Sequence, residues 1–122
     1  MKRIQRTRKK GFKMPENTVY VGRGTKWGNP FKLIGDMIYI DISHRSSKGN
    51  WKVYTMGDIT DVVYLYEVLW KNTGFVDKDM QYWSDHFHLL DLSELKGKNL
   101  ACWCPLDKTC HTDVLIKLVN QL

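Results

Sequence analysis

The sequence predicts an α/β fold: a compact, three-layered single domain in which crossover helices cover a small mixed sheet. Short β-forming segments alternate along the chain with segments whose apolar residues recur every three or four positions. Two unusual loops, 22–31 and 104–111, each follow a predicted strand. Ligands in open α/β sheets gather beyond the carboxyl ends of strands, so we expect both loops at one edge of the sheet.

The length of the chain, 122 residues, is that of one domain. No apolar run approaches the roughly 20 residues that a membrane span needs, and no apolar segment follows the basic N-terminus as in a signal peptide. The three cysteines are clustered and odd in number, unlike those of a secreted disulfide framework. These features predict a cytoplasmic protein whose cysteines are reduced thiols or metal ligands.

Positive charge is concentrated near the N-terminus. Residues 1–30 carry nine basic side chains and one acidic side chain, a net charge of +8, whereas residues 31–122 carry −2. We expect residues 1–13 to form a basic arm and residues 14–122 to form the α/β domain. Such an arm attracts nucleic acid through counterion release, binds a small phosphorylated ligand, or is merely a solvated tail.

Strands are predicted mainly in the first half of the domain. Residues 19–21 are β-forming and end at Gly22. The segments 37–42 and 51–55 are also strand-like, and the polar octapeptide SHRSSKGN lies between them. This arrangement predicts an inserted β-hairpin.

Two amphipathic helices and one further strand complete the pattern. A helix is expected from Asp58 or Thr60 to Gly74, and residues 99–103 have the composition of a buried strand. A C-terminal helix is predicted by one apolar face, formed by Val114, Leu115, Leu118, Val119 and Leu122.

The loop sequence VGRGTKWGNPF has the composition of a phosphate or nucleotide loop. Glycines allow a close backbone approach, and successive backbone N–H groups can cradle an anion. Arginine and lysine side chains bind phosphate oxygens, and tryptophan offers a flat face for a base or sugar. The loop matches no established phosphate-binding fingerprint, and Trp27 and Phe31 could instead be core anchors. We expect ligand binding by Gly22, Arg23, Gly24, Lys26, Trp27, Gly28 and Asn29, with Trp103 as a second stacking residue.

The sequence ACWCPLDKTCH contains all three cysteines and one histidine. Cys102, Cys104, Cys110 and His111 are four suitable zinc ligands, but their spacing differs from that of common zinc knuckles. Side chains of adjacent residues at a helix start are expected to diverge, which argues against Cys110 and His111 sharing a metal. We therefore expect no metal and no cofactor, and keep a zinc site as an alternative.

A helix start near residue 110 favours a reactive or ligand-binding role for the same segment. The positive end of the helix lowers the pKa of a thiol and offers free N–H donors to phosphate. Cys110, His111 and Asp113 are the candidate catalytic residues, with Asp113 placed to orient His111 or a substrate hydroxyl. Cys102 is expected to pack in the core as a small apolar residue.

Two long segments resemble a family of small bacterial and phage proteins that is catalogued only as a domain of unknown function. They are RIQRTRKKGFKMPENTVYVGRGTKWGNPF, residues 3–31, and KGKNLACWCPLDKTCHTDVLIKLV, residues 96–119, whereas residues 32–95 depart from the family pattern. The resemblance implies no established reaction. The family's motif positions on this chain are Val21, Gly22, Arg23, Lys26, Trp27, Gly28, Asn29, Pro30, Phe31, Cys102, Trp103, Cys104, Pro105, Cys110, His111 and Asp113.

Our leading hypothesis is a domain that binds a nucleotide or another ribose-phosphate ligand, with turnover of that ligand left open. The family's occurrence in phages extends this hypothesis to a phage protein that could sequester or destroy a host nucleotide signal. Two alternatives remain: a nucleic-acid-associated module anchored by the basic arm, and a zinc-stabilised interaction domain without catalysis. We expect no membrane partner, and a homo-oligomer is compatible with the sequence.

Overall fold

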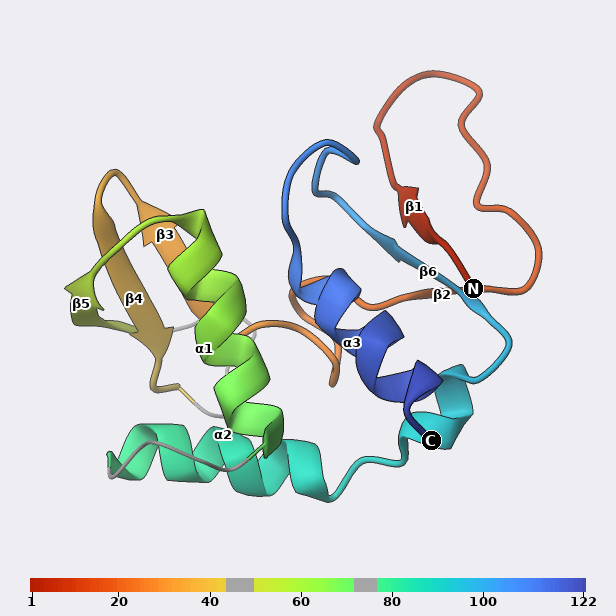
Figure 1. Cartoon of the computed structure of the whole chain (residues 1–122). Coiled ribbons are helices and arrows are strands. Elements are labelled where there is room, and N and C mark those ends of the chain that lie inside the picture. The colour runs from red at the N-terminus through yellow and green to blue at the C-terminus, as the bar shows by residue number, and fades with distance from the viewer. Residues whose placement is uncertain (44–49, 72–76) are drawn as a thin grey trace. The chain divides into compact units, whose positions relative to one another are not determined.

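The computed structural model describes residues 1–43, 50–71 and 77–122. They fall into two compact units, one formed by Met1–Gly28 with Asp91–Leu122 and the other by Asn29–Leu90. The described residues contain three α-helices, a three-stranded parallel sheet and a three-stranded antiparallel sheet (Figure 1). The predicted mixed α/β fold class is confirmed, with the parallel and antiparallel strands in separate sheets.

The first unit is built around a short parallel sheet. Its strands are β1 (Arg3–Gln5), β2 (Thr18–Tyr20) and β6 (Asn99–Cys102), in the order β1-β6-β2. The central strand β6 is apolar and largely buried, as expected for a parallel strand paired on both sides. Helix α3 (His111–Asn120) and the 3₁₀ turn η1 (Leu92–Leu95) pack against each other, and α3 also contacts β6.

Strand β1 lies inside the segment that the sequence predicts as a basic arm. Ile4 is in register with Ala101 of β6, and the backbone continues the ladder on both sides of the strand. The Leu100 N–H donates to the Lys2 carbonyl at 3.0 Å, and the Arg6 N–H donates to the Cys102 carbonyl at 2.7 Å. The beginning of the arm is therefore an edge strand of the sheet.

The second unit combines an antiparallel sheet with two helices. Strands β3 (Phe31–Ile34), β4 (Met37–Asp41) and β5 (Trp51–Met56) form the sheet, and β4 and β5 pair as the predicted hairpin. Most of the connecting octapeptide, residues 44–49, lies outside the described residues, as does the predicted helix end at Gly74.

The helices of this unit are α1 (Ile59–Lys71) and α2 (Lys78–His88). Asp58 caps α1 as predicted, because its carboxylate accepts from the Thr60 N–H at 2.9 Å. The buried ring of Tyr66 on α1 contacts Phe87 on α2 edge to face, with ring centroids 5.3 Å apart. None of the described helices has the length and apolar character of a membrane span.

We predict that the N-terminal edge strand contributes to stability. A chain beginning at Thr7 loses β1 and its backbone hydrogen bonds, each worth about 1 kcal/mol, and should unfold several degrees lower in a thermal melt followed by circular dichroism. The triple variant K9Q/K10Q/K13Q is the control, because these side chains are exposed and lie outside the strand. An unchanged melting temperature for the truncated chain would contradict the placement of β1 in the sheet.

Candidate functional site

The carboxyl ends of the three parallel strands bring distant segments of the chain together. Next to the Arg6–Cys102 hydrogen bond, the Val21 N–H donates to the Ala101 carbonyl at 2.9 Å. The segment after β1, the loop after β6 and the start of the glycine loop after β2 therefore emerge at one edge of the sheet. The residue before the first motif loop and the last residue of the second meet there, because His111 Nε2 and the Val21 carbonyl oxygen are 2.8 Å apart.

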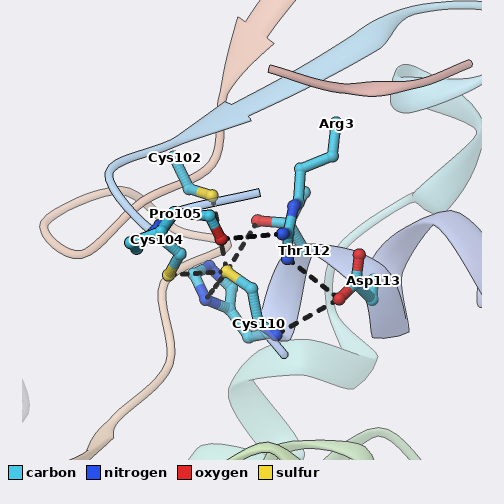
Figure 2. A network of polar contacts seen from close by, with 8 residues as sticks. Arg3, Cys102, Cys104, Pro105, Cys110, Thr112 and Asp113 are labelled. Carbon is cyan, nitrogen blue, oxygen red and sulfur yellow. Dashed lines mark hydrogen bonds and ion pairs between the residues drawn. The ribbon is translucent and has the colours of Figure 1, made fainter. Parts of the chain in front are cut away.

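The three cysteines form one cluster of sulfur atoms. Cys102 ends β6, Cys104 lies in the following loop, and Cys110 is the residue before α3. The Cys110 sulfur is 3.4 Å from that of Cys102 and 2.8 Å from that of Cys104 (Figure 2). All three Sγ atoms lie within 4.8 Å of one another. Cys102 and Cys110 are each 1% exposed, whereas Cys104 is partly exposed.

Close contact between the thiols shifts the pKa values of Cys104 and Cys110 in opposite directions. Hydrogen-bond contacts with the Cys102 and Cys104 thiols lower the pKa of Cys110 well below the usual value for cysteine. The same contacts with Cys102 and Cys110, together with burial, raise the pKa of Cys104. Of these two thiols, Cys110 is therefore the one that ionises more readily.

His111 points into the first unit and not toward solvent. It is 8% exposed, and burial lowers its pKa, which favours the neutral ring. A carbonyl oxygen only accepts, so the contact with Val21 requires the proton on Nε2. Nδ1 is then the acceptor nitrogen, and it lies 3.6 Å from the Cys110 sulfur. The expectation that Cys110 and His111 diverge is wrong, because the His111 ring folds back toward the neighbouring sulfur.

Asp113 is engaged in holding the start of α3. Its carboxylate accepts from the Cys110 backbone N–H at 3.2 Å, which caps the helix, and from Arg3 Nη1 at 2.9 Å. Arg3 also donates through Nη2 to the Pro105 carbonyl at 2.9 Å (Figure 2). The Arg3 side chain is 8% exposed, whereas the Asp113 side chain is 51% exposed, so the ion pair has one buried end and one solvent-facing end. Asp113 thus has a structural role that the sequence analysis did not foresee.

Two glycines fix the course of the loop after β2. Gly24 has a φ of +96°, a conformation that residues with a side chain rarely adopt. A Cβ atom on Gly28 would lie 2.9 Å from the Gly22 carbonyl oxygen, so only glycine fits without movement of the backbone. These two positions serve the shape of the loop.

The polar side chains predicted to bind a ligand are divided between surface and interior. Arg23 and Lys26 are exposed, and Lys26 forms an ion pair of 2.8 Å with Glu94. Trp27 is 3% exposed, which corresponds to the core role that the sequence left open and not to a stacking surface. Asn29 is also buried; its amide donates to the Val62 carbonyl at 3.1 Å and accepts from the Phe31 N–H at 2.8 Å. Trp103, by contrast, is 41% exposed.

Arginines near the N-terminus are the functional candidates that the sequence analysis missed as individual residues. In the sequence these arginines are part of a basic arm, but Arg6 and Arg8 are two positions apart and so share a face of an extended chain. Both guanidinium groups lie over the Trp103 ring. Arg3, in the strand before them, reaches the cysteine loop instead.

Comparisons with known proteins give a family and no function. No curated protein matches the chain, and no solved structure matches it. A family model matches residues 4–121, nearly the whole sequence and more than the two segments on which the resemblance was first seen. The chain therefore belongs to the family described as "Domain of unknown function (DUF4326)".

Proposed function

We propose that this protein is a zinc-stabilised binding domain in which Cys102, Cys104, Cys110 and His111 hold one Zn²⁺ ion. The convergence of three cysteine sulfurs from a strand end, a loop and a helix start is the observation that carries the proposal. Thiolate sulfur and imidazole nitrogen are the ligands of structural zinc sites, and the set of three cysteines and one histidine is common among them.

Two of the three distances measured from the Cys110 sulfur are close to those of a tetrahedral zinc site. With Zn–S about 2.3 Å and Zn–N about 2.05 Å, two sulfurs lie about 3.8 Å apart and a sulfur and a nitrogen about 3.6 Å apart. The observed distances from the Cys110 sulfur are 3.4 Å to Cys102 and 3.6 Å to His111 Nδ1. Its distance to Cys104, 2.8 Å, must lengthen by about 1 Å, and Cys104 lies on a partly exposed loop that can adjust.

His111 also has the outer contact expected of a zinc ligand. A ligating histidine usually donates its second ring N–H to a carbonyl or carboxylate, which fixes the ring and the tautomer. The Val21 carbonyl occupies that position for His111. The contact leaves Nδ1 as the nitrogen available to the metal.

Four protein ligands would leave no coordination position open for water or substrate, so the zinc ion would have a structural role. Residues 103–109 contain much exposed chain, so apolar burial contributes little to holding this loop. A metal bound to Cys102, Cys104 and Cys110 would join both ends and the middle of the loop to the sheet and to α3. The domain would then present the strand-end loops as a fixed surface for a ligand.

Catalysis by Cys110, His111 and Asp113 has less support. The Cys110 sulfur is buried, the His111 ring is bonded to a backbone carbonyl, and Asp113 is held by Arg3. Binding of a nucleotide or ribose-phosphate ligand is a second candidate function, favoured by a cluster of exposed aromatic and guanidinium groups beside the cysteine loop.

Metal content is the first test of the zinc proposal. Protein purified without chelators should contain about one zinc ion per chain by inductively coupled plasma mass spectrometry, and a chelator should lower its melting temperature by several degrees or more. Cys104→Ser should remove most of the zinc. Asp107→Asn, an exposed change in the same loop, should retain it. Zinc-free native protein with an unchanged melting temperature would refute the proposal.

The role of His111 can be separated from its contribution to packing by two substitutions. His111→Ala should lower zinc affinity by at least about 100-fold, since even outer contacts of a zinc ligand account for 10- to 100-fold. His111→Cys loses the same contact with Val21 but restores a fourth ligand, so it should recover tight binding. Cobalt substitution gives the readout, because a tetrahedral site with four sulfurs absorbs differently from one with three sulfurs and one nitrogen. An identical cobalt spectrum in wild-type and His111→Ala protein would exclude His111 as a ligand.

A further inference from the structure

We propose that a pocket beside the cysteine loop binds a nucleoside phosphate, with the base against Trp103 and the phosphate held by Arg6 and Arg8. The pocket belongs entirely to the first unit and has a volume of about 510 Å³, within the range of small-molecule sites. Its lining comprises Arg6, Thr7, Arg8, Phe12, Met14 and Trp103. The metal ligands are not part of it, so this site is additional to the zinc centre.

Trp103 provides an accessible aromatic surface at the end of the central strand. The preceding residue, Cys102, is 1% exposed, whereas Trp103 is 41% exposed. Indole faces of this kind bind nucleobases by stacking, and they do so with little dependence on base identity. Phe12 and Met14 add apolar surface to the lining of the same pocket.

Arg6 and Arg8 supply positive charge at the same place. The Arg6 guanidinium is 4.8 Å from the Tyr20 ring centroid and 5.0 Å from that of Trp103, and the Arg8 guanidinium is 5.4 Å from that of Trp103. Within residues 1–43, 50–71 and 77–122, neither arginine forms an ion pair with a carboxylate. Two arginines held by aromatic rings and lacking an anionic partner in this part of the chain favour an anionic ligand, and planar guanidinium groups suit phosphate oxygens.

The combination selects for a ligand that has both a flat ring and a phosphate. Inorganic phosphate cannot stack on the Trp103 ring, and an uncharged aromatic ligand cannot form ion pairs with the two arginines. Bases in a duplex are hidden from stacking on a side chain, so the ligand is a free nucleotide or a nucleotide unit of a single strand. Arg8 is exposed and can move from the ring to the phosphate as the base takes its place.

In this proposal Arg6 and Arg8 bind the ligand within a defined pocket, and the rest of the basic N-terminal segment does not. The salt dependence of binding distinguishes this from an arm that binds polyanions along its whole length. Two arginine–phosphate contacts predict that the logarithm of single-strand affinity falls with the logarithm of salt concentration with a slope of about −1.4. Engagement of the whole basic segment would give a much steeper slope, because each additional contact adds about −0.7.

The test uses the 122-residue chain as purified without chelators, and binding is measured by isothermal titration calorimetry. The probes are the four ribonucleoside 5′-monophosphates, the corresponding nucleosides, inorganic phosphate, and the single strands dT8 and rU8. At least one monophosphate or single strand should bind saturably, and more tightly than phosphate or nucleoside alone. Preference for the monophosphates indicates a free nucleotide, and preference for dT8 or rU8 indicates a unit of a single strand; either result supports the pocket.

Matched variants locate the binding site. R6Q/R8Q and Trp103→Leu should each weaken binding by about tenfold or more, while Trp103→Phe retains most of it. The control K9Q/K10Q removes the same charge from exposed positions outside the pocket and should change affinity by less than about twofold at physiological salt. The proposal is overturned if no nucleotide or strand binds at millimolar concentration, if phosphate alone binds as well, or if K9Q/K10Q has the effect of R6Q/R8Q. Circular dichroism of each variant separates loss of the pocket from loss of the fold.

Discussion

Parallel pairing of β6 with a neighbour on each side is the constraint on which the candidate site depends. It sets Ile4 beside Ala101 and Val19 beside Leu100, although these pairs are 97 and 81 residues apart in the sequence. Because all three strands run in the same direction, the segments that follow them emerge at one edge. Arg6, the cysteine loop and Val21 are neighbours for this reason alone.

At the start of α3, the helix must be capped, the charge of the capping residue must be neutralised, and the cysteine sulfurs must be packed. Its first backbone N–H groups need acceptors, and the Asp113 carboxylate meets part of that need while Arg3 neutralises its charge. The buried cysteine sulfurs and the His111 ring are packed against the same turn. Residues that suggest an active site in the sequence therefore have internal partners in the structure, and these partners favour metal binding over acid–base catalysis.

Sequence patterns predict the elements of this fold better than they predict how its loops are used. Strand-forming runs and the amphipathic face of α3 depend on local periodicity, and both appear as expected. The pairing of Arg3 with Asp113 spans 110 residues and leaves no local signal. The burial of Trp27 and the exposure of Trp103 likewise depend on tertiary packing, because a tryptophan in a loop has the same composition signal in either environment.

The alternation of burial through residues 102–104 links the two proposals. Cys102 is buried, Trp103 is exposed, and the sulfurs of Cys102 and Cys104 lie on the same side in one cluster. Strand β6 ends at Cys102, and the chain bends at Trp103 and Cys104. A metal that holds the two cysteines inward necessarily holds the intervening tryptophan outward, where Arg6 and Arg8 meet its ring. In this arrangement a bound zinc ion would contribute to ligand binding without touching the ligand, because it would fix the direction of the side chain on which the base would stack.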